Sequence, residues 1–378
     1  MSYICEREAS KVAEFLGFSC DGANPIVTFR NPLELANWTL PVLELLIVGG
    51  AIFAFVHAWR RWRRDGDPIN IALWFGSLVY LAVIEPPLYF PSWFGLQEYV
   101  GFIFSHNVFT VQFMYDRLPL YIVAFYTVSS QLIYEIVRVL GIFERRGAFV
   151  GAAAAAFVSQ VFYEMFDQLG PQLRWWAWNP ANEVNQPMLA SVPMNSMWVF
   201  ASVSFGVLVW LAVKLLGVRP GRTALSGGQV AWRTVLAGVL TPVLMVVLAA
   251  PTRVGVSASG SHDVQRTLVI VLLAMLWIVG VVLLVEAAQR TSPSRRLSSS
   301  KPGATSPDFA RIYPGIYLGV HVLLWAAALP AYLAARDGVT AAGTPIGCGP
   351  YALACIVAAT LIVLITRRAT SKKSAVTT

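Results

Sequence analysis

The chain has 378 residues, of which 57% are hydrophobic and 13% are charged, and its formal net charge is +8. Soluble domains carry about 25% charged residues, so this composition excludes a water-soluble protein of this length. The positive charge falls mostly in alternate loops between apolar segments. That sidedness is typical of a membrane protein and argues against nucleic acid as a partner.

Residues 1–37 form a tail before the first apolar segment, with no basic stretch followed by an apolar core, so we expect no cleaved signal peptide. Nine segments then follow that could each cross a bilayer of about 30 Å, which takes about 20 residues of helix. The second and last are short, and a re-entrant segment is the alternative there. We predict an all-α, polytopic transmembrane bundle of about nine spans. They are Trp38–Trp59, Ile69–Ile84, Leu118–Leu140, Gly147–Phe166, Ser196–Leu216, Val230–Ala250, Thr267–Val285, Tyr313–Ala334 and Tyr351–Ile365.

The basic residues predict how this bundle is oriented. With nine spans, 20 of the 28 lysines and arginines fall on one side, within 60–64, 138–146, 214–233, 290–311 and 367–373. Because cytoplasmic loops are enriched in Lys and Arg, we expect the N-terminus outside and the C-terminus inside a cell membrane. Cys5 and Cys20 would then lie outside, where a disulfide and two unpaired thiols are equally compatible with the sequence.

The two halves of the chain differ in polarity. Residues 38–217 hold five spans with carboxylates, amides and many aromatic side chains, and we interpret them as the functional core. Residues 218–366 hold four spans rich in Val, Leu and Ala, with a Ser/Pro/basic cytoplasmic linker at 290–312, and we interpret them as a supporting bundle. Residues 367–378 form a basic cytoplasmic tail.

Two long outer loops belong to the core. The loop 85–116 is too hydrophobic for a solvated loop, which favours a short interfacial or re-entrant helix lying over the bundle, and 167–195 favours a second lid. The second loop carries Trp175, Trp176 and Trp178. These are either membrane-interface tryptophans or the lining of a pocket.

Acidic side chains lie at or near the ends of four apolar segments. A central aspartate costs about 2.5–3.5 kcal/mol on membrane-insertion scales, so such residues face a protein interior or a water-filled cavity. With the topology above, we expect all of them at one depth on the outer side. The acidic residues are Glu44, Glu85, Asp116, Glu164 and Asp167.

The sharpest local pattern is on the fourth segment, where Gln160, Glu164 and Asp167 share one helix face. Two interpretations remain open: a polar clamp with Arg117 or Arg174, and an acid or ion-binding pair joined by the other carboxylates. Crowded carboxyl groups in a low dielectric cannot all ionise, and one that keeps its proton can act as a general acid. Arg117, next to Asp116, is expected to neutralise a member of this cluster, with phosphate binding as the alternative.

Further along the third span, Glu135 lies three residues before Arg138, a spacing that predicts an interfacial ion pair. No zinc-binding spacing, nucleophile elbow or phosphate-binding glycine loop is present in the sequence. Classical hydrolase and nucleotide-driven mechanisms therefore have no support in the sequence.

At these residues the chain resembles the carotenoid hydratase family of membrane proteins, which hydrates terminal double bonds in bacterioruberin-type pathways. The resemblance covers roughly residues 80–210, about a third of the chain. It is carried by Glu85 with Phe94-Gly95 and Tyr99, by Leu118-Pro119-Leu120 with Tyr134, by Glu164 to Asp167 with Trp176-x-Trp178, and by Val192-Pro193-Met194-Asn195.

The resemblance implies acid-catalysed hydration or cyclisation of a polyprenoid or carotenoid-like lipid, a reaction that needs neither a metal nor an organic cofactor. Its catalytic acids would be Glu164, Asp167, Glu85 and Glu44. The substrate would contact Trp175, Trp176, Trp178, Tyr163, Asp116, Arg117 and Asn195, with aromatic faces stabilising a carbocation. Two other classes remain: a proton-coupled lipid or small-molecule transporter, and a non-catalytic scaffold of an envelope complex, in which the carboxylates would pair with arginines. The sequence does not indicate an oligomeric state.

Overall fold

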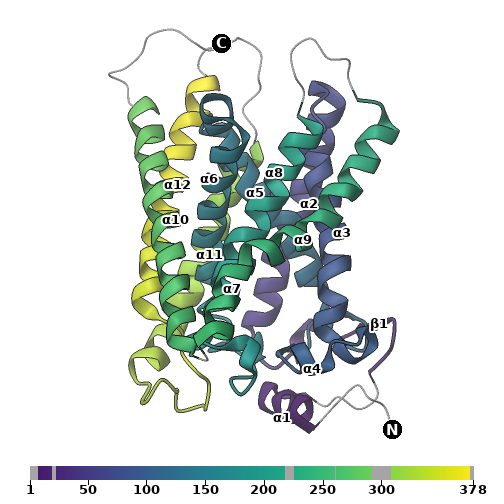
Figure 1. Cartoon of the computed structure of the whole chain (residues 1–378), viewed down its shortest axis with the longest axis vertical. Helices are drawn as coiled ribbons and strands as arrows, with labels where there is room; N and C mark the ends of the chain where they lie inside the picture. The colour runs from purple at the N-terminus through teal and green to yellow at the C-terminus, as the bar shows by residue number, and fades with distance from the viewer. Residues whose placement is uncertain (1–6, 19–22, 218–224, 260, 292–307, 375–378) are drawn as a thin grey trace.

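A computed structural model of the chain describes residues 7–18, 23–217, 225–259, 261–291 and 308–374. In these ranges nine helices are long and apolar enough to cross a membrane, which confirms the predicted all-α polytopic bundle. Figure 1 shows them packed side by side, with the short elements α1 and α4 at one end. The spans are α2 (Thr39–Asp65), α3 (Ile69–Tyr89), α5 (Leu120–Val139), α6 (Ile142–Asp167), Met194–Leu216, α9 (Gly227–Ser259), α10 (His262–Thr291), α11 (Asp308–Leu333) and α12 (Gly349–Ser374).

Several helices extend beyond the predicted spans. α2 continues through its arginines to Asp65, where Arg61 donates hydrogen bonds to Asp65 and Asp67 at 2.7 and 2.6 Å. α6 begins at Ile142 and bends at Gly147, whose φ of 76° lies in the left-handed region that favours glycine. Hydropathy does not detect polar helix ends outside the apolar stretch, because it marks only the residues that lie in lipid.

α5 is the centre of the bundle. In the apolar stretch of α5, 89% of the residues are buried inside the protein, against 33%, 28% and 22% in the apolar stretches of α9, α10 and α11. The low values follow from side chains such as Val246, Ile278 and Leu323, which cover the outer surface and are 60–70% exposed. These three helices therefore present an apolar face to lipid, as a membrane span at the periphery must.

The fifth span has three parts: α7 (Met194–Trp198), a π-helical segment η4 (Val199–Ser204) and α8 (Phe205–Leu216). Inside η4, the Ser202 hydroxyl donates to the Met197 carbonyl at 2.9 Å and also to the Gln160 side chain on α6. A π-helical turn holds one more residue than the α-helical turns around it. The segment thus locks this span against α6.

The N-terminal tail and the two long loops build a small cap at the α1 end. Its helices are α1 (Arg7–Leu16), η1 (Pro32–Glu34), η2 (Pro91–Phe94), α4 (Gln97–Val100) and η3 (Glu183–Asn185). Its strands are β1 (Val27–Phe29), β2 (Phe104–His106), β3 (Val111–Phe113), β4 (Leu118–Pro119), β5 (Trp176–Trp178), β6 (Met188–Leu189) and β7 (Val192–Pro193). The order in the three-stranded sheet is β1-β3-β4.

The cap differs from the single interfacial helix favoured for 85–116. This loop instead forms two short helices and two strands. β2 pairs antiparallel with β5 of the second loop, with Phe104 opposite Trp178 and His106 opposite Trp176, and β3 pairs with β1 and β4. Backbone hydrogen bonds thereby satisfy a segment that is buried between apolar side chains.

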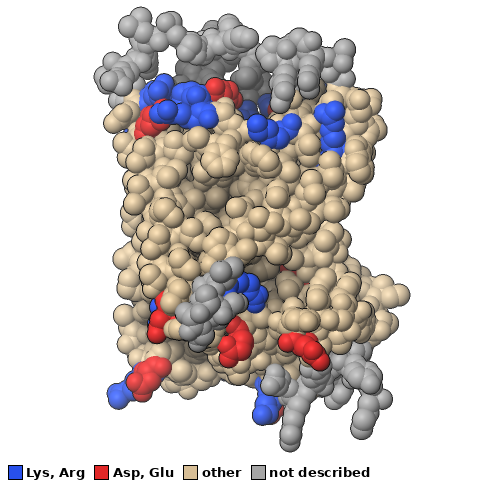
Figure 2. All heavy atoms as spheres, in the orientation of Figure 1, with Lys and Arg blue, Asp and Glu red and all other residues tan. Residues whose placement is uncertain are grey.

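Lysines and arginines gather at the opposite end of the bundle, as Figure 2 shows for one face. Which end faces the cytoplasm stays a prediction. The possible Cys5–Cys20 disulfide lies outside the described residues, as does most of the linker, 292–307. The rest of the expected linker is helical, at the end of α10 and the start of α11.

Candidate functional site

A cavity of about 450 Å³ lies in the bundle beneath the cap. Its walls come from α3, α5, α6, η4, α8 and α9, and β2, β5 and α4 cover it. Aromatic side chains dominate the lining, among them Tyr80, Phe125, Tyr126, Tyr163, Phe166 and Phe205. A volume of this size is typical of sites for small apolar ligands. Residues of α9, from the half expected to be a supporting bundle, form one wall.

Glu85 stands in the last turn of α3 and is 6% exposed. Its Oε1 accepts a hydrogen bond from the Tyr126 hydroxyl on α5 at 2.5 Å. Its Oε2 is buried and has no hydrogen-bond partner among the described residues. One carboxyl oxygen on the cavity wall is thus held in place while the other is left open.

Asp167 ends α6, is 1% exposed and lines the same cavity from another side. Its Oδ2 also lacks a hydrogen-bond partner in the described part of the chain. Neither Asp167 nor Glu85 forms an ion pair with a described lysine or arginine. The cavity therefore carries two uncompensated carboxyl groups.

Glu164 lies one turn before Asp167 but is not among the lining residues. Its Oε2 accepts a hydrogen bond at 2.8 Å from Gln168, whose own side-chain oxygen accepts one from the Cys348 backbone. Its Oε1 has no partner among the described residues. Glu164 is fully buried in the contact between α6 and the loop before α12.

The other two acids of the expected layer bind the cap. Glu44 on α2 accepts the backbone N–H groups of Thr110 and Val111 at 3.2 and 3.3 Å. Asp116 pairs with Arg30 at 2.5 Å. Neither carboxylate is among the cavity-lining residues. Arg117 lines a second, much smaller pocket under η2.

Trp175, Trp176 and Trp178 do not all point to the same side, because side chains alternate along a strand. Trp176 and Trp178 are two apart on β5, so they point to the same side, and both line the cavity. Their indole N–H groups are buried without an acceptor among the described residues. Trp175 points the other way, is fully buried, and donates to the Thr39 hydroxyl at 2.8 Å.

The remaining predicted contacts, Tyr163 and Asn195, both line the cavity. The Tyr163 ring packs edge-on against Phe125, with centroids 5.3 Å apart. The Asn195 amide is fully used: it donates to the Val184 and Gln186 carbonyls and accepts from Gln265. Asn195 thus holds the second loop in place over the cavity.

His106 is a lining residue that the sequence did not single out. It is 7% exposed, and its Nδ1 lies 3.0 Å from the Tyr121 hydroxyl. Burial lowers the pKa of His106 from 6.5 to about 3, so the imidazole is uncharged at neutral pH. Its only sequence signal is its place in a hydrophobic loop. The pairing with Trp176 that brings it to the cavity spans 70 residues of sequence.

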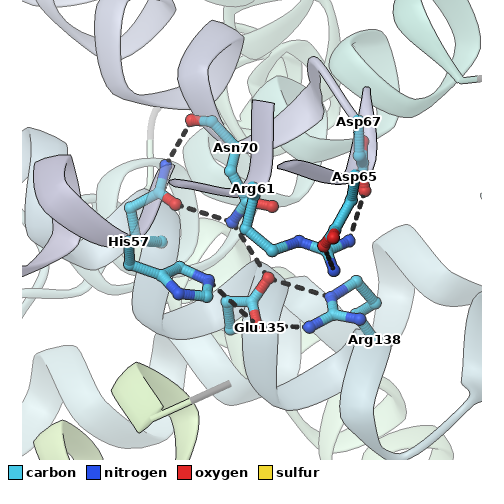
Figure 3. Close-up of polar contacts among 8 residues, drawn as sticks. His57, Arg61, Asp65, Asp67, Asn70, Glu135 and Arg138 are labelled. Atoms are coloured by element: carbon cyan, nitrogen blue, oxygen red, sulfur yellow. Dashed lines mark hydrogen bonds and ion pairs between the residues drawn. The ribbon is translucent and has the colours of Figure 1, made fainter. Parts of the chain in front are cut away.

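A second buried acid, Glu135 on α5, has very different surroundings (Figure 3). Arg138 donates to both of its carboxylate oxygens at 2.9 and 2.7 Å, which confirms the predicted ion pair. Asn70 on α3 adds a hydrogen bond at 2.9 Å, and His57 Nε2 on α2 lies 3.4 Å away. We call these four residues the Glu135 cluster. It joins three helices, as a structural polar network does.

Among the described residues, no group of three or more His, Cys, Asp or Glu side chains could hold a metal ion. Comparison with protein-family models, with curated proteins and with solved structures finds no match for this chain. The cavity and its side chains are therefore the basis for any functional assignment.

Proposed function

We propose that this chain is an integral membrane enzyme that hydrates or cyclises a double bond of a polyprenoid or carotenoid-like lipid. One observation carries the proposal: Glu85 and Asp167, two buried carboxyl groups, both line an aromatic cavity, and each has an oxygen without a hydrogen-bond partner among the described residues. Carboxyl groups placed so in a membrane bundle are costly and mark functional sites.

In the reaction, one carboxylic acid gives its proton to the less substituted carbon of the double bond, which leaves a tertiary carbocation. The aromatic rings of Tyr163, Phe166 and Trp176 line the cavity and can stabilise that cation by about 2 kcal/mol each once it is desolvated. Water then adds to the cation and gives a proton back to a carboxylate, so the net change is addition of one water. In a cyclisation, a second double bond adds instead and the proton is returned.

The cavity wall reaches the lipid-facing surface, which suits a substrate dissolved in the bilayer. Val246 on α9 both lines the cavity and is 69% exposed, and Tyr99 on α4 lines it and is 76% exposed. A volume of about 450 Å³ accommodates one end of a long polyprenoid, not the whole chain. The remainder would lie in the membrane beside α9.

The test replaces the acids by amides. Glu85→Gln and Asp167→Asn keep size and hydrogen bonding but cannot deliver a proton, so we expect loss of the hydrated or cyclised lipid by at least ~10²-fold. Lipids extracted from cells expressing each variant would be compared by mass spectrometry, with protein amount and thermal stability measured in parallel. Glu14→Gln, an exposed acid on α1, is the matched control. Normal product from both well-folded amide variants contradicts the proposal.

A proton-coupled transporter is the second candidate. The observation in its favour is a series of buried polar side chains on α5, Thr127, Ser130 and Gln131, between Tyr126 at the cavity and Glu135. Intramembrane polar chains of this kind serve as proton relays in transporters. Proteoliposomes separate the two: a transporter moves protons or lipid across the bilayer, whereas the enzyme changes the lipid chemically without such flux.

A scaffold has less support. Its carboxylates should pair with arginines, as Asp116 does with Arg30 and Glu135 with Arg138. Glu85 and Asp167 depart from that pattern in the described structure. Loss of product only in parallel with loss of protein, in the amide variants, would favour the scaffold.

A further inference from the structure

We infer that the ligand of this cavity carries a hydroxyl group at its buried end. The inference deepens the proposed function, on which it rests for a lipid ligand in this cavity, by naming the polar group that the site recognises. It comes from the six buried polar atoms of lining residues that have no partner among the described residues: Tyr80 Oη, Glu85 Oε2, Asp167 Oδ2, Trp176 Nε1, Trp178 Nε1 and Ser196 Oγ.

These atoms require both a donor and an acceptor from the ligand. Each carboxylate oxygen accepts hydrogen bonds, and each indole N–H can only donate. A hydroxyl group has one O–H donor and two acceptor lone pairs, so it can serve both kinds of atom. Buried polar atoms in native proteins nearly always have a partner, which makes six such atoms around one cavity a sign of a missing ligand group.

An anionic head group fits this end of the cavity poorly. Two carboxyl groups face it, and His106, the nearest basic side chain under the cap, stays uncharged because burial lowers its pKa to about 3. Arg253 on α9 also lines the cavity, but its side chain is exposed. A charged head group thus belongs near the rim, and a neutral one belongs inside.

An ammonium head group satisfies only half of the site. It would pair with the carboxylates and contact the aromatic rings, as organic cations do. It has no lone pair, however, so the Trp176 and Trp178 N–H groups would stay without an acceptor. A purely hydrocarbon end leaves all six atoms unpartnered, and such a mismatch is strongly rejected by a site built around hydrogen bonds.

The experiment measures equilibrium binding of four C20 isoprenoid probes to the purified full chain in nanodiscs. The probes are geranylgeraniol, its methyl ether, the matching hydrocarbon and the matching primary amine. We expect the alcohol to bind about 10-fold or more tightly than the ether and the hydrocarbon, because only the alcohol donates as well as accepts. Equal affinity for alcohol, ether and hydrocarbon overturns the inference, and so does tighter binding of the amine.

Trp176→Phe tests the acceptor side, since it keeps an aromatic ring and removes the N–H. We expect it to weaken binding of the alcohol by about 5- to 10-fold, roughly one hydrogen bond, and to leave hydrocarbon binding unchanged. Trp232→Phe, at an exposed position of α9 outside the cavity, is the control. An unchanged alcohol-to-hydrocarbon ratio in a folded Trp176→Phe protein contradicts the inference.

Binding and turnover can fail separately. Selective binding of the alcohol together with normal product formation by the Glu85→Gln and Asp167→Asn variants would reject the acid-catalysed reaction and keep the hydroxyl site. Loss of product in those variants without alcohol selectivity would do the reverse.

Discussion

Glu85 and Glu135 are both buried glutamates on neighbouring helices of one bundle, yet their surroundings are opposite. Around Glu135, Arg138 and Asn70 donate to the carboxylate, and its charge is compensated inside the protein. Around Glu85, Tyr126 makes one hydrogen bond, and the second oxygen has no partner among the described residues. Burial alone therefore does not identify a functional acid. The informative feature is an oxygen that the fold leaves open on a cavity wall.

The largest expected effect on stability is at the Glu135 cluster. Glu135→Gln should lower the free energy of unfolding by about 3–5 kcal/mol, because Arg138 is left as a buried, uncompensated charge. Glu85→Gln should cost about 1 kcal/mol or less, since the amide oxygen can still accept from Tyr126 and no cation is stranded. Unfolding by SDS in mixed micelles measures both. Equal losses of unfolding free energy in the two variants would contradict the proposed difference between Glu85 and Glu135.

A smaller effect should appear as a pH dependence of the cavity region. Burial holds the pKa of His106 near 3, against 6.5 in the unfolded chain, so on acidification the unfolded state binds a proton that the folded state refuses. His106 therefore contributes stability above about pH 6.5, and that stability falls by about 1.4 kcal/mol per pH unit as the pH drops towards 3. Thermal unfolding measured between about pH 4 and about pH 7 should show a flatter dependence of stability on pH for His106→Gln than for the parent chain. Parallel profiles would mean that His106 is hydrated or charged in the fold.

The smallest effect compares two adjacent tryptophans. Trp175→Phe removes a buried hydrogen bond to Thr39 and should cost about 1 kcal/mol of stability beyond the change in ring size. Trp176→Phe removes an N–H that has no described partner, so beyond the same change in ring size its stability should stay unchanged or rise. Thermal unfolding of the two variants side by side gives the difference. A larger loss for Trp176→Phe would show that its N–H has a partner in the membrane-embedded protein.

The spans could be predicted from the sequence because each needs one long apolar stretch, and lipid allows no other solution for the backbone than a helix. Their ends could not, since polar turns such as the one ending α2 at Asp65 are held by local pairs like Arg61–Asp67. Hydropathy carries no information about such pairs.

The site was predictable only in part, because helix spacing gives a shared face but not what that face meets. Glu164 and Asp167 share a face of α6, but the cavity meets the part of the helix surface that carries Tyr163, Phe166 and Asp167, and Glu164 is not among its lining residues. His106 reaches the cavity through the pairing of β2 with β5. Pairing between segments so far apart depends on the packed bundle below them, which no local pattern encodes.

The π-helical segment η4 has a consequence for how this span tolerates insertions and deletions. Residues before and after it are out of phase with a continuous α-helix, in which each residue turns about 100° around the axis. Deleting one residue between Val199 and Ser204 would restore the regular repeat and rotate α7 by that amount relative to α8. Asn195 and Ser196 would leave the cavity wall while the α8 face packed on α6 stayed in place. The extra residue therefore fixes the rotation of α7 relative to α8, so that α8 packs against the bundle while a different face of α7 lines the cavity.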